Sequence, residues 1–271
     1  MTKWNYEGKR VVIAGCVSGM GEATAKQLVE LGAEVHGFDI RESGVEMASF
    51  QALDLRDPSS IKVAVSTIDG QFDALFNCVG VWQTFPAMDV MKVNFIGLRL
   101  WTELLIPKIR SGGAICSISS VAGMAWATQL PECKELISRA DFDSAVEWVR
   151  QNPEPVADGY SFSKAVLNVW TMIQGTHLIK KNVRINCTLP GPTQTRMMLD
   201  FEKAASRQLI NVFAAPSNRR ASPEEQAAPI VFLNSDAATY INGHCLPVDG
   251  GFLGAVGVGE IDIQALLANG A

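Results

Sequence analysis

The sequence predicts a single α/β domain, built on a parallel sheet of about seven strands with helices on both faces. Short apolar runs alternate with amphipathic stretches along the chain, as a parallel sheet with crossover helices requires. The first apolar run leads straight into the glycine-rich turn Gly15-Cys16-Val17-Ser18-Gly19-Met20-Gly21, and a helix follows at once. Because crossovers of this kind are right-handed, we expect a Rossmann-type, doubly wound sheet that binds ligands at the carboxyl ends of its strands.

The expected strands are short apolar runs bounded by turn or polar residues, at 10–14, 35–38, 50–54, 72–77, 114–118, 183–188 and 244–248. The expected helices have apolar residues at helical spacing, at 22–31 (ended by Gly32), 58–67, 87–110, 159–180 and 223–234. The chain has no internal repeat and no low-complexity segment. Residues 1–271 are therefore expected to form one dinucleotide-binding and catalytic domain.

Composition excludes several classes of function. With 48% hydrophobic residues among 271, the chain can bury a large core, whereas its net charge of −5 argues against a nucleic-acid or anionic membrane partner. No apolar run reaches the roughly 18 residues of a membrane span. The start has no apolar signal core, so we expect a cytoplasmic protein. The six scattered cysteines are typical of buried free thiols, and the three histidines form no ligand spacing, so no metal site is expected.

The glycine-rich turn has the form of a dinucleotide site, although a plain glycine-rich turn is the alternative. Glycines allow the tight turn and let the backbone approach a pyrophosphate, which rests on the amides at the start of the helix. Asp39 ends the second strand, 18 residues after Gly21. A carboxylate there can accept hydrogen bonds from the ribose hydroxyls and repel a 2′-phosphate, which favours NAD over NADP. Arg41 lies close enough to weaken this preference.

Tyr160 is the one tyrosine of three that has a lysine, Lys164, four residues later. On a helix these positions share a face, so the ammonium can stand beside the phenol and stabilise its phenolate. The pair could therefore act as an acid or base. The alternative is an ordinary exposed helical pair.

Together these features resemble the classical short-chain dehydrogenase/reductase family, from about residue 8 to residue 253. The glycine turn is similar to the family's TGxxxGxG, with Ala14 in place of the threonine. The other matching segments, in order, are Leu53-Asp54-Leu55, Asn77-Cys78-Val79-Gly80 with two departures from NNAG, Val93-Asn94, Ile118 to Gly123, Tyr160 to Lys164 (YxxxK), and Pro190-Gly191 with Thr195. The resemblance implies contacts of NAD with Gly15, Ser18, Gly19, Met20, Gly21, Asp39, Asp54, Leu55, Asn77, Gly80, Tyr160, Lys164, Pro190, Gly191, Thr193 and Thr195.

The resemblance also implies the chemistry, which is hydride transfer between a nicotinamide and a secondary alcohol or ketone. Tyr160 would be the acid/base, and Lys164 would lower its pKa and hold the nicotinamide ribose. Ser120 would bind the substrate oxygen. Since strand side chains alternate faces, Ser119 and Ser120 cannot both point into the cleft, and the family motif favours Ser120. Asn94 would position a relay water, unless it is only a capping or packing amide.

One departure from the family is large, because Ser120 and Tyr160 lie 40 positions apart where about a dozen are usual. An insertion at about 126–158 contains two expected short helices, at 131–136 and 143–149, each with a capping residue at its start. It resembles the insertion of the bacterial 3α-hydroxysteroid dehydrogenase/carbonyl reductase branch. Since it adjoins the helix that commonly builds the family's tetramer interface, we expect a homo-oligomer that is a dimer or an altered tetramer. The alternative is a surface loop without quaternary effect.

The substrate prediction depends on apolar residues after the strands, namely Trp82, Phe85, Met124, Trp126, Met197, Met198 and Phe201. They would suit a hydrophobic, cyclic alcohol or ketone such as a hydroxysteroid or terpenoid, although they could equally be packing residues. Residues 193–217 could form a lid. The tail at about 254–271 could carry a helix at 261–268 that docks on a partner subunit, or it could be frayed. The alternative to an enzyme is a non-catalytic NAD-binding regulatory protein on the same fold.

Overall fold

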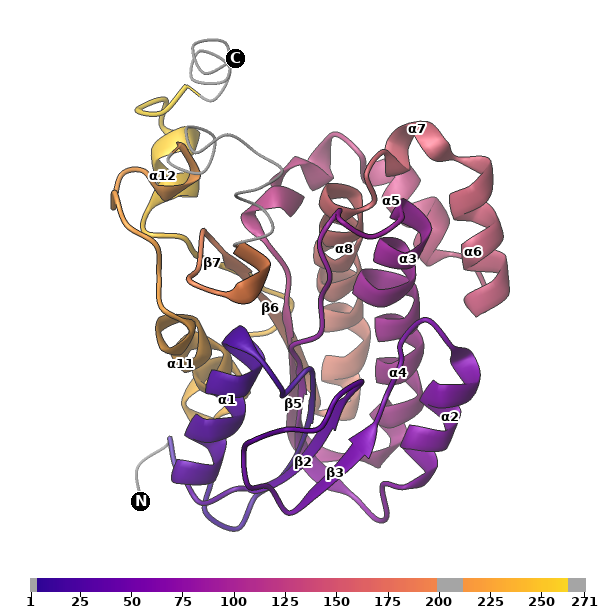
Figure 1. The fold of residues 1–271 in the computed structure, drawn as a ribbon, viewed down its shortest axis with the longest axis vertical. Helices are drawn as coiled ribbons and strands as arrows, with labels where there is room; N and C mark the ends of the chain where they lie inside the picture. The colour runs from indigo at the N-terminus through magenta and orange to yellow at the C-terminus, as the bar shows by residue number, and fades with distance from the viewer. Residues whose placement is uncertain (1–3, 199–211, 263–271) are drawn as a thin grey trace.

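A parallel sheet of seven strands forms the centre of the molecule. The structure is a computed structural model that describes residues 4–198 and 212–262. The strands lie in the order β3-β2-β1-β4-β5-β6-β7. Their bounds are β1 Arg10–Ala14, β2 Glu34–Asp39, β3 Ser49–Ala52, β4 Phe72–Asn77, β5 Ile109–Ile118, β6 Arg184–Pro190 and β7 Cys245–Val248. The order reverses between β1 and β4, which confirms the prediction of a doubly wound, Rossmann-type sheet (Figure 1).

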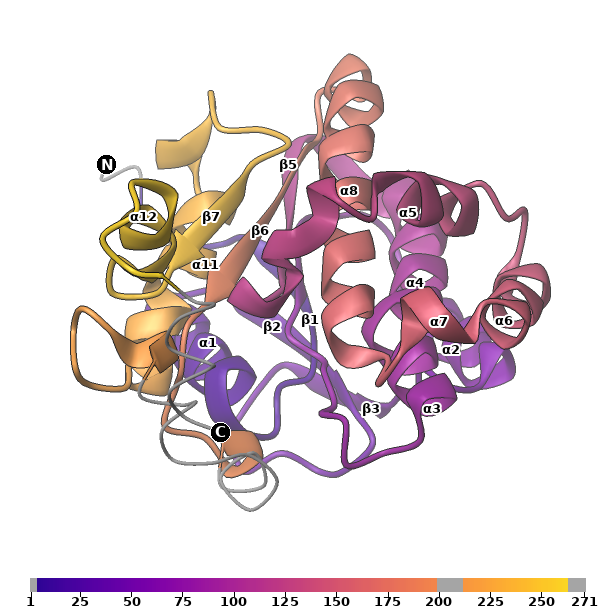
Figure 2. The same cartoon turned by 90° about the horizontal axis from the view of Figure 1, so that it is seen from above.

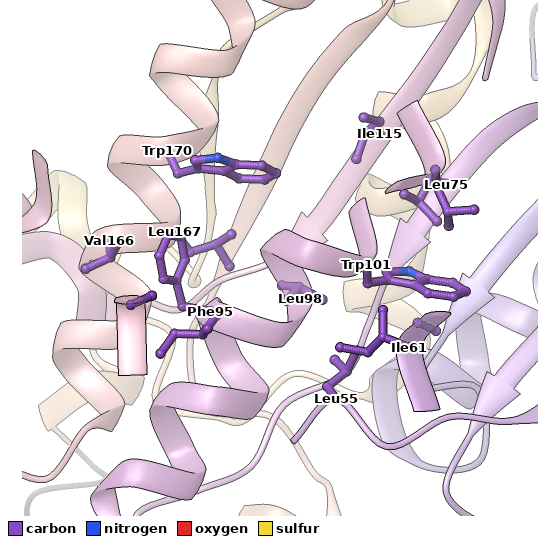
Figure 3. Packing of buried hydrophobic residues seen from close by; sticks show 14 of the residues in the cluster. Leu55, Ile61, Leu75, Phe95, Leu98, Trp101, Ile115, Val166, Leu167 and Trp170 are labelled. Atoms are coloured by element: carbon purple, nitrogen blue, oxygen red, sulfur yellow. The ribbon is translucent and has the colours of Figure 1, made fainter. Parts of the chain in front are cut away.

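Helices cover both faces of this sheet (Figure 2). On one face, α1 (Gly19–Glu30) packs beside α11 (Pro223–Asn234). The other face is covered by α2 (Pro58–Ser66), α4 (Gly97–Leu105) and α8 (Tyr160–Leu178). On that second face the indole rings of Trp101 and Trp170 are fully buried against residues of β4 and β5 such as Leu75 and Ile115 (Figure 3). Such burial on both faces explains the uninterrupted apolar run of β1 after Arg10.

The segment expected to be one helix at 87–110 is instead divided. It forms α3 (Ala87–Met91), a π-helical turn (Lys92–Ile96), α4, and a 3₁₀ turn (Ile106–Lys108), and β5 then begins at Ile109 rather than at residue 114. The expected helix was too long because Pro107 has no backbone N–H with which to continue the α-helical hydrogen bonds. Helix α4 therefore ends shortly before the chain enters the sheet as β5.

The insertion region folds into three helices on the outer side of α8 (Figure 1). These are α5 (Leu130–Ile137), α6 (Phe142–Gln151) and α7 (Pro153–Val156), of which α7 was not expected. At α6, Asp141 and Ser144 form a reciprocal capping box, as expected, whereas α5 starts without a side-chain cap. The indole of Trp148 stacks on Phe162 of α8, with ring centroids 5.9 Å apart. This region is therefore packed onto the helix that begins with Tyr160.

A buried arginine ties the end of α11 to the sheet. Arg184, the first residue of β6, is 6% exposed and donates hydrogen bonds to the backbone carbonyls of Leu233 at 2.6 Å, Ser235 at 3.0 Å and Ile241 at 3.3 Å. Burial lowers the pKa of its guanidinium. Because Leu233 lies in the last turn of α11, this side chain satisfies a carbonyl that the helix leaves unpaired, and it also ties the segment after the helix to β6.

The remaining expectations concern cysteines, metals, membranes and the tail. Cys16, Cys116, Cys133 and Cys187 are buried free thiols as expected, whereas Cys78 and Cys245 are half-buried. Within residues 4–198 and 212–262, no three His, Cys, Asp or Glu side chains gather closely enough to hold a metal ion, and no helix is long and apolar enough to span a membrane. The last described helix is α12 (Phe252–Gly257), and most of the expected helix at 261–268 lies outside the described residues.

Candidate active site

A cleft opens at the carboxyl ends of β1, β2, β4 and β5, where the reversal of strand order leaves space between the connecting loops. Its cavity measures about 540 Å³. The residues expected at the site that line it are Gly15, Ser18, Gly19, Met20, Gly21, Asp39, Asp54, Leu55, Gly80, Trp82, Phe85, Tyr160, Lys164, Thr195 and Met197. Segments from both halves of the chain therefore meet in one cavity.

The glycine turn is shaped so that side chains would not fit. Gly15 has a φ of +86°, and a Cβ there would lie 2.5 Å from the backbone nitrogen of Val79. A Cβ on Gly21 would overlap the carbonyl oxygen of Gly15. Ser18 precedes α1 without capping it through its side chain, so the first amides of the helix remain available to an anion. This geometry fits a dinucleotide pyrophosphate.

Two of the expected nucleotide residues that line the cleft are carboxylates, and among the described residues Asp54 has an ion-pair partner whereas Asp39 has none. Asp39, at the end of β2, accepts hydrogen bonds from the backbone amides of Val17 at 3.2 Å and Ile40 at 2.7 Å. Asp54 is instead paired with Arg56 at 2.6 Å, and the hydrogen bond from this guanidinium holds the pKa of Asp54 below its usual value. The position of Asp39 fits a ribose contact. Asp54 is instead bound to Arg56, a cleft residue that was not predicted from the sequence.

Tyr160 and Lys164 lie on the first turn of α8 and face the cleft. The Lys164 ammonium lies 5.8 Å from the centre of the phenol ring and donates a hydrogen bond to the carbonyl oxygen of Ile118 at 2.9 Å. Burial lowers the pKa of Lys164 to about 8. The pKa of Tyr160 is raised, chiefly by burial. We had expected Lys164 to lower it, and Lys164 is not among the causes of the shift. The physical reason is that both groups are buried, and burial disfavours the charged form of each.

The two serines of the motif differ in what their hydroxyls contact. The Ser119 hydroxyl donates to the carbonyl oxygen of Lys164 at 3.2 Å, and Ser119 also lines the cleft. The Ser120 hydroxyl accepts from the amide of Ala122 at 3.1 Å, and its hydrogen bond with Tyr160 lowers the pKa of the phenol. Ser120 is thus the serine next to the phenol.

Asn94 lies inside the π-helical turn, and its side chain is fully used by neighbouring groups. Its Oδ1 accepts from the backbone amide of Val81 at 2.8 Å, and its Nδ2 donates to the Val81 carbonyl at 3.0 Å and to Ser163 at 3.3 Å. The side chain therefore acts as a packing amide that fixes the loop after β4 against α8. The relay-water role stays a prediction.

Some expected nucleotide residues are not brought to the cleft. The Asn77 side chain is buried and donates to Thr102 at 2.9 Å and Ser117 at 3.2 Å, so it joins β4 to its neighbours. Pro190, Gly191 and Thr193 lie near Thr195 but do not line the cavity, and the Thr193 hydroxyl donates to the carbonyl of Gly191 at 2.9 Å.

The expected substrate residues also lie in different places, and only some of them line the cleft. Trp82 packs against the Tyr160 ring with centroids 4.2 Å apart, and Phe85 is 46% exposed at the mouth. Met124 packs on the cluster around Phe252, and Trp126 packs toward the insertion helices. Met198 lines a neighbouring cavity of about 470 Å³, and Phe201 and most of the expected lid lie outside the described residues.

Several residues that sequence reasoning did not select line the same cleft, including Ile40, Arg56, Val79, Val81, Thr84, Asp89 and Arg196. Their closeness in sequence to predicted site residues could have identified some of them. Arg56 is two residues after Asp54, and Arg196 directly follows Thr195.

Comparisons with known proteins agree with this geometry. Residues 9–131 match the family model described as short chain dehydrogenase, and residues 148–253 match one described as enoyl-(acyl carrier protein) reductase. Coniferyl-alcohol dehydrogenase from Pseudomonas sp. (strain HR199 / DSM 7063) is 34% identical over 90% of this chain and 96% of its own. The 3-alpha-hydroxysteroid dehydrogenase/carbonyl reductase of Comamonas testosteroni is 31% identical over 89% and 95%. The crystal structure of 3-alpha-hydroxysteroid dehydrogenase from Pseudomonas sp. B-0831 with NADH is 27% identical, with a TM-score of 0.77 over 93% of this chain and 100% of that one.

Proposed function

The chain belongs to the short-chain dehydrogenase/reductase family and is an oxidoreductase of that type, and from this premise we propose that it interconverts a hydrophobic, cyclic secondary alcohol and its ketone with NAD(H). The observation that carries the proposal is that Tyr160 and Lys164 line the same cleft as the glycine cradle, with the Ser120 hydroxyl hydrogen-bonded to the phenol. The relative with a crystal structure binds NADH, which supports a nicotinamide cofactor here.

In the proposed reaction a bound nicotinamide supplies or accepts the hydride. Tyr160 donates its hydroxyl proton to the substrate oxygen during reduction and removes it during oxidation. Burial raises the pKa of Tyr160, so the phenol is protonated at neutral pH and ready to donate. Ser120 hydrogen-bonds the same oxygen, on which charge grows. Lys164 is proposed to hold the nicotinamide ribose, and its hydrogen bond to the Ile118 carbonyl holds the ammonium near the phenol. Thr195, which lines the cleft, is proposed to hold the carboxamide.

Asp39 supports NAD over NADP, and neutralising it is expected to change that preference. In Asp39→Asn the amide oxygen can still accept from Val17, but the charge that repels a 2′-phosphate is gone. We expect the NADPH to NADH ratio of dissociation constants to fall about tenfold, because one such charge contributes roughly 1.4 kcal/mol. Quenching of tryptophan fluorescence by each nucleotide measures this ratio. Glu42→Gln, which neutralises an exposed carboxylate three residues later, is the control, and an unchanged ratio in Asp39→Asn would contradict the assignment.

The substrate proposal is supported by the apolar wall beside the phenol. Trp82 lies against Tyr160, and Phe85 and Met197 line the same cavity. The test is NADH formation with a panel of hydroxysteroids, cyclic terpenols and simple secondary alcohols, with coniferyl alcohol included because of the relative that is named for it. We expect turnover with cyclic alcohols. Tight NAD binding without turnover of any compound would favour the alternative of a non-catalytic, NAD-binding regulator.

We propose further that the protein is a cytoplasmic homo-oligomer, either a dimer or an altered tetramer. The free thiols suit a reducing compartment. The insertion helices α5 to α7 lie on the outer side of α4 and α8, where the family's usual tetramer contact would form (Figure 2). Light scattering gives the oligomeric state, and a tetramer that buries α8 against a second α8 would rule this assembly out.

A further inference from the structure

The path of the backbone into Tyr160 is closely fixed. Only residues 157–159 join the end of α7 to the start of α8. Ala157 has a φ of 46°, which a residue with a side chain rarely adopts, and Gly159 has a φ of 81°. A Cβ on Gly159 would lie 2.7 Å from the carbonyl oxygen of Ala87, so this junction is pressed against α3. The insertion region therefore leads into the tyrosine through a turn with little freedom.

Asp158 holds the start of the tyrosine helix. The residue before the helix, Gly159, has no side chain to cap it, and the Asp158 Oδ1 instead accepts a hydrogen bond from the Tyr160 amide at 2.8 Å. On the other side, the Ser163 hydroxyl donates to the Tyr160 carbonyl at 2.7 Å and is itself held by Asn94. Both backbone polar groups of Tyr160 are thus bound by side chains, and the Asp158 carboxylate interacts favourably with the helix N-terminus.

On the basis of the function proposed above, we infer that Asp158 is a positioning residue for the reaction. It fixes the backbone of Tyr160 at the end of the cleft, and its negative charge favours the protonated phenol, the form that donates to a carbonyl oxygen. Asp158 itself is exposed while Tyr160 is buried, so the carboxylate acts from the solvent side of the junction without touching substrate.

The charges around the phenol support this assignment. Burial raises the pKa of Tyr160 most, the Ser120 hydroxyl lowers it, and the Asp158 carboxylate raises it further. Other charged groups on α8 itself and on the elements packed against its first half are Lys164 of α8, Asp89 of α3, Lys92 of the π-helical turn, Glu154 of α7, Asp143, Glu147 and Arg150 of α6, and Glu132, Lys134 and Glu135 of α5. None of them is among the causes of the shift, which singles out Asp158 as the charge to change.

The experiment compares Asp158→Asn, Asp158→Ala and Glu154→Gln in the full-length protein. The asparagine keeps an oxygen that accepts from the Tyr160 amide and loses the charge, whereas the alanine loses both. Glu154→Gln removes an exposed carboxylate of α7 that makes no hydrogen bond to Tyr160, and it is the matched control. Tyrosinate absorbance is titrated in each protein, with and without saturating NAD, and the curve of the same protein carrying Tyr160→Phe is subtracted so that only Tyr160 is followed.

We expect the Tyr160 midpoint to fall by about half a pH unit in Asp158→Asn, because a unit charge on the solvent side of the junction acts on the phenol through a partly aqueous setting. High salt should shrink the difference from wild type, and Glu154→Gln should titrate as wild type does. The pH profile of alcohol oxidation, measured with the fastest compound of the panel, should move in the same direction. In Asp158→Ala the plateau kcat should also fall several-fold, and Asp158→Asn should restore it.

An unmoved midpoint in Asp158→Asn, or an equal movement in Glu154→Gln, would overturn the inference. Because the titration needs no substrate, it separates this failure from a failure of the proposed function. That function fails instead if Tyr160→Phe turns over substrate as fast as wild type while Asp158→Asn still shifts the midpoint.

Discussion

Replacing Tyr160 by phenylalanine lowers turnover about 10²-fold to 10⁴-fold, the range expected for loss of a positioned acid/base. The ring and its packing against Trp82 are retained, since only the hydroxyl is removed. Nucleotide affinity should change much less, because the glycine cradle and Asp39 are left intact. The measurement is kcat with the best compound of the panel, together with the dissociation constant of NADH.

Tyr240→Phe is the matched control for this change, because it removes a phenol hydroxyl from a fully exposed side chain. It should leave kcat unchanged. If Tyr160→Phe also left kcat unchanged, the acid/base role of Tyr160 would be lost, and with it the proposed mechanism.

Replacing Arg184 by methionine is expected to cost about 3 to 5 kcal/mol of unfolding free energy. The apolar part of the side chain is kept, but the buried carbonyl of Leu233 loses its charged donor, whereas those of Ser235 and Ile241 keep the donors Ala238 and Asn186. A hydrogen bond from a charged group contributes about 1.5 to 3 kcal/mol. The midpoint of urea unfolding, followed by circular dichroism, measures the change.

Arg110→Met serves as the comparison, because Arg110 is half-exposed and pairs with Asp73 at the surface. Its loss should cost less than about 1 kcal/mol. Equal losses of unfolding free energy in the two variants would mean that the hydrogen bonds of Arg184 stabilise the protein no more than the surface ion pair of Arg110 does.

Much of the fold could be predicted from the sequence because the strands of a parallel sheet are buried on both faces. That burial makes most of β1 a continuous apolar run that is visible without a structure. The glycine turn could be predicted for a related reason, since the backbone there leaves no space for side chains at Gly15 and Gly21. Where the local pattern is ambiguous, prediction failed. The π-helical turn and the early start of β5 at Ile109 depend on tertiary packing.

Side-chain direction was the second limit of the sequence. The motif around Asn77 places its backbone next to the cleft but does not show that its amide turns inward to Thr102 and Ser117. Trp126 and Met124 follow the serine motif directly, yet they pack on two different clusters. The engagement of Asp54 by Arg56 depends on the rotamers of two exposed side chains, which no spacing rule describes.

The position of the three insertion helices also bears on how the chain folds. Strands β5 and β6 are hydrogen-bonded neighbours, and the insertion roughly doubles the length of the crossover that joins them. The entropy of closing a loop grows only with the logarithm of its length, so this doubling costs about 0.6 kcal/mol. Burial of Trp148 against Phe162 alone offsets such a penalty. An insertion of this length therefore costs little free energy at this point in the chain. Its helices can form from local contacts before β5 and β6 pair.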